Sequence, residues 1–158
     1  MFLTRDAALR QAFGPKARVD TTTVYLLPAQ VARIEQAAGA KLASARVVSY
    51  RGSVGDSLVG TAYLDTHPVR SQMETILIVI TPQGRVGAVE VLAFNEPEDY
   101  LPPPRWLERF DGKALAKDLK PGLAVPNLSG ATLTARAVSA AVRRTLALHA
   151  FLTAPAGR

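Results

Sequence analysis

The segment ILIVITPQGRVGAVEV, residues 76–91, decides the fold. Its first five residues are all aliphatic, residues 81–84 (TPQG) are typical of a tight turn, and a second run rich in valine follows from residue 86. This pattern predicts a β-hairpin. Because the first arm is apolar on both of its faces, we expect that arm to lie inside a sheet and not at its edge.

Further strands precede this hairpin. Runs rich in Val, Ile and Tyr, separated by Gly-rich or polar turns, cover residues 46–50, 57–65, 75–81 and 86–94. They predict an antiparallel meander. Residues 23–27 add one short β-rich stretch near the N-terminus.

Helical periodicity flanks these strands and predicts helices over residues 3–13, 28–39 and 132–152, with short helical pieces at 106–110 and 114–119. Thr4 is suited to cap the first helix, and Val138, Val142, Leu146 and His149 form one stripe of the last. We therefore expect a single α+β domain, in which an antiparallel sheet carries helices on one side. Within it we expect residues 1–44 to form an N-terminal helical segment and residues 45–158 the main domain.

Composition excludes several classes of protein. The chain has 158 residues, of which 48% are hydrophobic and 20% charged, and this excludes a disordered chain. The longest aliphatic run, residues 76–80, is far shorter than the roughly 20 residues of a membrane-spanning helix. The absence of cysteine removes disulfides, zinc–thiolate sites, iron–sulfur clusters and thiol nucleophiles.

The net charge of +6 lies entirely in the last third of the chain, where residues 105–158 hold nine Lys or Arg against three Asp or Glu. A nucleic-acid site would also need interleaved aromatic residues, and this third contains only Trp106, Phe110 and Phe151. We therefore favour a solvated basic face, with Arg136, Arg143 and Arg144 away from the apolar stripe, and expect no nucleic-acid partner.

Familiar catalytic patterns are missing. The two histidines, His67 and His149, are about 80 positions apart, and no His, Asp or Glu cluster has the spacing of a metal site. The sequence also lacks a phosphate-binding P-loop, a dinucleotide fingerprint and a nucleophile elbow. We expect neither a metal nor an acid–base catalytic residue.

The segment NLSGATLT, residues 127–134, stands directly before the longest predicted helix. Ser129 or Thr132 suits a helix cap, and Gly130 suits a tight backbone entry. The same small residues would also let a bulky anion approach the free N–H groups at a helix N-terminus, where the helix dipole favours negative charge. The residues leave both interpretations open.

The stretch SGATLTARAV, residues 129–138, resembles the SGATxTSxAV signature of FMN-binding domains. Such domains include the flavin-carrying subunits of the sodium-pumping NADH:quinone oxidoreductase and of the Rnf complex. The resemblance implies that FMN is the cofactor and that a flavin transferase esterifies its phosphate to Thr132. It also implies that the phosphate is surrounded by Ser129, Gly130, Ala131, Leu133 and Thr134.

The resemblance extends over about residues 59–150 and places Glu96 and Pro97 in a loop that borders the flavin ring. The position three residues before Ser129, usually Asp in the transferase motif, is Pro126 here. Both an ester and non-covalent FMN therefore remain open.

A flavin ring is a flat apolar plate with a polar edge, and side chains on the proline-rich loop suit it. Tyr100, Leu101 and Trp106 are the candidates there, and His67 and Arg70 are candidates beside the preceding strand. The alternatives are a core position for Trp106, a solvated carboxylate for Glu96, and plain surface charge for His67 and Arg70.

The resemblance implies an electron carrier in an extracytoplasmic or membrane-associated redox chain, with a membrane-associated redox partner protein. We expect the native chain to carry an export signal and the protein itself not to be transmembrane. The positive helix end and nearby basic residues are expected to raise the flavin potential. The alternative is a non-enzymatic sensor or interaction module that binds flavin or another phosphate ligand.

Overall fold

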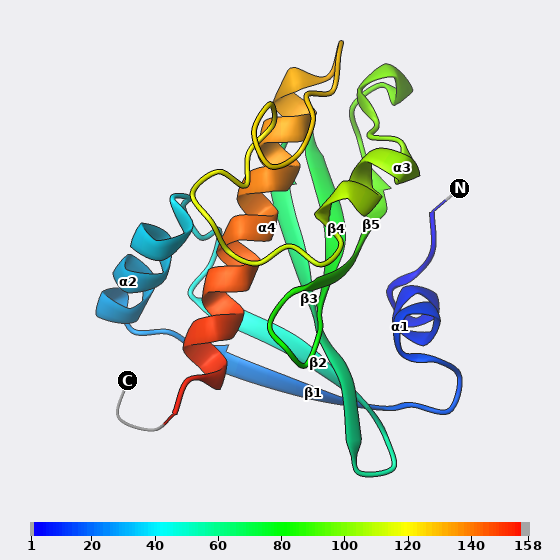
Figure 1. The fold of residues 1–158 in the computed structure, drawn as a ribbon, viewed down its shortest axis with the longest axis vertical. Coiled ribbons are helices and arrows are strands. Elements are labelled where there is room, and N and C mark those ends of the chain that lie inside the picture. Colours follow the sequence, from blue (N-terminus) through cyan, green and yellow to red (C-terminus); the bar gives the residue numbers. More distant parts are fainter. Residues whose placement is uncertain (1, 156–158) are drawn as a thin grey trace.

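The computed structural model describes residues 2–155 and contains one five-stranded antiparallel sheet. The strands follow one another in sequence order across the sheet (Figure 1): β1 (Arg18–Tyr25), β2 (Arg46–Val54), β3 (Ser57–Pro68), β4 (Met73–Ile80) and β5 (Val86–Phe94). The predicted hairpin is confirmed, with a turn in which the N–H of Gly84 donates to the carbonyl of Thr81 at 2.9 Å. β4 is paired on both sides, as its apolar character predicted.

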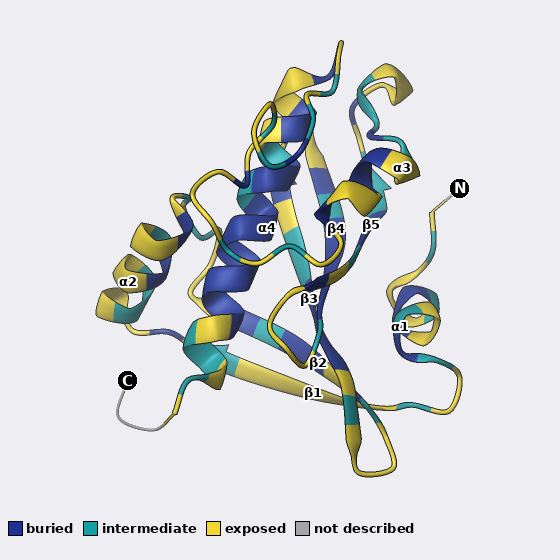
Figure 2. Ribbon diagram, in the orientation of Figure 1, coloured by how far each residue is buried: buried dark blue, intermediate teal, exposed yellow. Residues whose placement is uncertain are grey.

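β1 is longer than the predicted stretch at residues 23–27. It pairs with β2 from Arg18 opposite Ser53 to Tyr25 opposite Arg46, and it forms one edge of the sheet. Nearly all of its residues are exposed (Figure 2), so the strand lacks the alternation that marks a half-buried one. The first 44 residues thus contribute a strand as well as helices.

α4 (Thr132–Thr153) crosses one face of the sheet over β3 and β4 (Figure 1). Its inward side is buried (Figure 2), and Val138, Ala141 and Val142 are completely inaccessible. They belong to the same core cluster as the alternate β4 residues, Ile76, Ile78 and Ile80. α2 (Pro28–Ala38) packs beside α4. Within residues 2–155, no helix combines the length and the hydropathy that a membrane crossing requires.

The expectation that all helices lie on one side of the sheet is wrong. α1 (Arg5–Phe13), capped as predicted by Thr4, packs on the opposite face and closes a second core cluster over Leu77 and Val79. The physical reason is the aliphatic run in β4, because a strand that is apolar on both faces needs cover on both.

Short elements follow β5: the 3-10 helix η1 (Glu98–Tyr100), α3 (Pro104–Leu107) and the 3-10 helix η2 (Glu108–Phe110). The helical piece predicted at residues 114–119 is wrong. The chain there is extended and then turns, and the carbonyl of Lys113 accepts from the N–H of Val86 at 2.9 Å. Leu119 anchors the segment in the core with 1% exposure.

The contact between α1 and the sheet yields a prediction. A Cβ atom at Gly52 would lie 2.3 Å from the ring of Phe13, so Gly52→Ala should destabilise the fold by about 1–3 kcal/mol. Urea unfolding measures the penalty in the natural chain and in a Phe13→Ala background, where the space is free. An equal penalty in both backgrounds would contradict this packing.

Candidate functional site

The chain enters α4 through a tight turn at residues 128–131. The N–H of Ala131 donates to the carbonyl of Leu128 at 2.9 Å, and Gly130 has φ +80°, a left-handed conformation that favours glycine. Ala131 is the N-cap, and no side chain bonds the first turn. The prediction that Ser129 or Thr132 caps this helix is therefore wrong, because Thr132 is already helical and Ser129 stands two residues before the cap.

A pocket of about 300 Å³ opens at this uncapped helix start. The pocket is lined by residues 130–134 and by Arg70 and Tyr100. The structure thus brings together side chains from three separate segments that the sequence analysis had singled out.

Two threonines at the helix start differ in their surroundings. Thr134 is 1% exposed, and its Oγ1 has no hydrogen-bond partner within residues 2–155. A buried hydroxyl without a partner is costly, so a donor or acceptor from a ligand in the pocket would satisfy it. Thr132, by contrast, is exposed to solvent.

Arg70 gives the pocket a positive wall. Its guanidinium lies over the ring of Tyr100, 4.5 Å from the ring centroid, and it forms no ion pair with any described carboxylate. Tyr100 is the last residue of η1, and its backbone N–H donates to the carbonyl of Pro97 at 3.0 Å. The charge of Arg70 and the uncapped N–H groups of α4 both favour an anion here.

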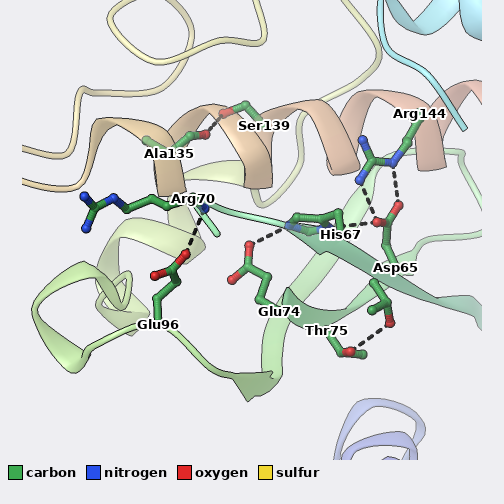
Figure 3. A network of polar contacts seen from close by, with 10 residues as sticks. Asp65, His67, Arg70, Glu74, Thr75, Glu96, Ala135, Ser139 and Arg144 are labelled. Carbon is green, nitrogen blue, oxygen red and sulfur yellow. Dashed lines mark hydrogen bonds and ion pairs between the residues drawn. The ribbon is translucent and has the colours of Figure 1, made fainter. Parts of the chain in front are cut away.

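Glu96 holds the turn that carries Arg70 (Figure 3). Its Oε2 accepts from the backbone N–H of Arg70 at 2.9 Å, the hydrogen bond drawn in Figure 3. It also accepts from the N–H groups of Ser71 and Gln72 at 2.8 and 2.9 Å. The hydrogen bond from the N–H of Gln72 lowers the pKa of this carboxyl most, and the hydrogen bonds from Ser71 and Arg70 lower it further. Glu96 is therefore neither a solvated carboxylate nor a residue that lines the pocket.

His67 lies behind the same turn, between two carboxylates (Figure 3). Its Nδ1 is 2.9 Å from Asp65 Oδ1 and its Nε2 is 2.6 Å from Glu74 Oε1. Because ionised carboxylates only accept, this arrangement needs both ring nitrogens protonated. Burial opposes the charge, but the hydrogen bonds that His67 donates to Asp65 and Glu74 outweigh it and raise the pKa of His67.

Arg144 completes this network from α4. It donates to both carboxylate oxygens of Asp65, at 2.7 and 2.6 Å, and joins the sheet to the helix. Burial disfavours the charged form of Asp65, yet His67 and Arg144 lower its pKa overall. Among the described residues no cluster of three metal-ligating side chains could hold a metal ion.

The basic residues of α4 are not a solvated face, which corrects the expectation for two of them. Arg143 and Arg144 are each only 8% exposed. Arg143 donates to the carbonyls of Ala38 and Leu119 at 2.9 and 3.0 Å. It thereby satisfies a carbonyl at the C-terminus of α2, where a cation is favoured.

Trp106 and Leu101 are placed away from the pocket. The indole N–H of Trp106 donates to the carbonyl of Pro126 at 2.8 Å, and its ring packs edge-on against Phe110 at 5.2 Å. Leu101 is half-buried against the main core. These contacts fix the loop that leads into residues 128–131, and Pro97 starts the turn of η1.

A model of the FMN-binding domain matches residues 71–147, the segment that contains the Glu96 turn, Tyr100 and the start of α4. These residues are similar to the FMN-binding domain family. The match indicates FMN as the cofactor. No curated protein matches the chain.

Sequence reasoning missed the partners that position the pocket at the start of α4. Nothing in the local sequence of Glu96 marks it as the acceptor of three N–H groups 24–26 residues earlier in the chain. Glu74 escaped notice for the same reason, since it meets His67 only through the pairing of β3 with β4, whereas Asp65 stands two residues before His67 on β3 itself. Their alternation with apolar residues on the same strands was the available signal.

The three N–H bonds at Glu96 lead to a prediction. Glu96→Gln removes the charge from the acceptor, so amide hydrogen exchange at residues 70–72 should accelerate by at least about tenfold. Glu98→Gln, on the same segment but exposed and without a described side-chain contact, should leave these rates unchanged. Unaltered exchange at residues 70–72 in Glu96→Gln would contradict the assigned role.

The two histidines predict opposite pH dependences of stability. The pKa of His67 is raised on folding, so its contribution is full below about pH 6.5 and is lost as pH rises through the folded value. Burial lowers the pKa of His149, so its contribution is present above about pH 6.5 and is lost as pH falls.

Urea unfolding between about pH 5 and 8 tests both signs. In His149→Phe the free energy of unfolding should fall more steeply with rising pH than in the natural chain. In His67→Gln the free energy of unfolding should instead rise with rising pH. At pH 6 this variant should be less stable than the natural chain by about 3 kcal/mol, as for a broken buried ion pair. Identical slopes in the two variants would refute the network.

Proposed function

We propose that this protein is an electron carrier that holds the phosphate of FMN at the start of α4. The observation that carries the proposal is the pocket itself, where an uncapped helix start, the unpartnered Thr134 hydroxyl and the unpaired Arg70 face one another. A phosphate monoester carries about −1.5 to −2 charges at pH 7 and three acceptor oxygens. Its charge and acceptors suit these donors.

Thr132 is the proposed acceptor if the FMN is covalent. Its hydroxyl is exposed at the first helical position, whereas the hydroxyl of Thr134 is sealed. A flavin transferase acting on the folded chain could therefore reach Thr132 alone of the two. The N–H groups of the first turn would donate hydrogen bonds to the phosphate oxygens.

The flavin ring is proposed to lie against Leu133 and Tyr100. Leu133 is 45% exposed beside the pocket, and Tyr100 offers a ring already stacked by Arg70. Bound FMN supplies the one- or two-electron chemistry. Arg70 and the positive end of α4 would stabilise the anionic reduced flavin and so raise its potential.

The redox setting is proposed from the resemblance of residues 129–138 to the flavin-carrying subunits. It comprises an extracytoplasmic location, a membrane-associated redox partner protein and a flavin transferase. Support from this chain is the accessibility of Thr132, which such a transferase requires. In the alternative, a sensor or interaction module, bound FMN would exchange no electrons with a partner.

The covalent form is tested on protein exported from cells that contain a flavin transferase. Denatured natural protein should show a mass increase equal to FMN minus one water, and its flavin spectrum should stay with the polypeptide. Thr132→Val keeps the shape of the side chain but lacks the hydroxyl, so the adduct should disappear. Thr134→Val removes the neighbouring hydroxyl and should keep the adduct.

Mass spectrometry with visible absorption on the two variants decides between the sites. An adduct that persists in Thr132→Val would overturn the assignment of Thr132. Release of intact FMN from denatured natural protein would overturn the ester and leave a non-covalent carrier, consistent with Pro126 in the transferase motif. A colourless protein after addition of FMN would overturn the proposed function.

A further inference from the structure

A second cavity lies at the C-terminal end of α4, between that end of the helix and strands β1–β3. Its volume is about 800 Å³, within the range typical of small-molecule sites. Thr132 lines the first pocket and His149 lines the second. Along a helix, the distance from residue 132 to residue 149 is about 25 Å. The two pockets are therefore separate, and most of the residues that line the second lie outside the family match at residues 71–147.

Polar side chains converge on this cavity from adjacent strands. In the register of β2 and β3, Ser49 is opposite Tyr63 and Arg51 is opposite Thr61, so all four share the face covered by α4. Ser49, Thr61 and Tyr63 are at most 8% exposed. The hydroxyls of Ser49 and Thr61 have no described hydrogen-bond partner, yet neither is among the sealed polar atoms. They are thus open to the cavity.

His149 adds a further donor or acceptor from α4. Its Nδ1 is 2.8 Å from the hydroxyl of Tyr63, and their rings meet edge-on. Nε2 has no hydrogen-bond partner in the described part of the chain and is not sealed. Burial and the nearby Arg51 lower the pKa of His149, so the ring is neutral at pH 7. Its Nε2 is left to form a hydrogen bond with a ligand.

The charge in the cavity is positive and uncompensated. Arg51 forms no ion pair with any described carboxylate, and no acidic residue lines the cavity among residues 2–155. Asp20 stands opposite Arg51 in the register of β1 and β2, but its carboxylate accepts from Arg18 at 3.2 Å. The apolar wall is formed by Val24, Leu26 and Leu146.

We propose that this cavity binds a small organic carboxylate with an apolar body. The carboxylate faces Arg51, Nε2 of His149 and the hydroxyls of Ser49 and Thr61, and the body lies against the apolar wall. A few convergent polar groups beside an aliphatic surface are the usual make-up of such sites. A guanidinium gives a carboxylate charge-assisted hydrogen bonds.

Benzoate is the probe, and benzamide is its neutral counterpart of the same shape. Each is titrated into the full ¹⁵N-labelled chain up to about 10 mM, with and without added FMN, and the amide shifts are mapped. Benzoate should shift the amides of residues 49–51, 61–63 and 146–150, and benzamide should bind at least about tenfold more weakly.

Arg51→Gln should weaken benzoate binding by roughly tenfold or more and leave benzamide unchanged. Arg46→Gln, an exposed arginine on the same strand, is the matched control and should have no effect. Thr61→Val, which removes a buried hydroxyl without changing shape, should also weaken benzoate binding.

Three results would overturn the proposal. They are an absence of shifts at about 10 mM benzoate, equal binding of benzamide, and shifts confined to Arg70, Tyr100 and residues 130–134. The last would place the carboxylate in the phosphate pocket. Because the titration follows amide signals and not flavin colour, its outcome is independent of the proposed role of FMN.

Discussion

Burial of one face of α4 against the aliphatic face of β3 and β4 fixes the geometry of the site. Val138, Ala141 and Val142 are fully buried in the cluster that includes Ile76 and Ile78. With this register set, the first turn of the helix stands over the turn that carries Arg70, and its last turns stand over β1–β3. Both pockets therefore depend on the same packed interface.

Charges inside the fold reinforce that interface. Asp65 and Glu74 are balanced by His67 and Arg144, and this group links β3, β4 and α4 in one buried network. Such networks contribute little net stability but are costly to break, so they select one arrangement of helix and sheet. Arg143 links α4 to α2 by donating to the carbonyl of Ala38. Arg70 and Arg51 are exceptions, since neither forms an ion pair with a described carboxylate.

The sequence predicted the elements well where one face of a segment is buried. The helix over residues 132–152 follows from periodicity, and the β4–β5 hairpin follows from its aliphatic runs and the turn between them, whereas β1 is exposed and gave no alternation. α1 on the second face was foreseeable from the two-sided apolar character of residues 76–80. The local signature at residues 129–134 located the start of the site.

The remainder of the site depends on contacts between distant segments. Glu96 is predicted to border the flavin, and three backbone N–H groups from the turn after β3 donate to its carboxylate. Trp106 is predicted as a ring contact, and its indole N–H donates to the carbonyl of Pro126. Neither partner can be read from spacing, because a turn and a sheet register bring them together.

The start of α4 and Arg70 are proposed to recognise the phosphate of the cofactor. Fluorescence titration of Thr132→Val with FMN and with riboflavin, which lacks the phosphate, tests this recognition without interference from an ester. FMN should bind at least about a hundredfold more tightly than riboflavin, and Arg70→Gln should remove much of this difference. Equal affinities for the two flavins would contradict it.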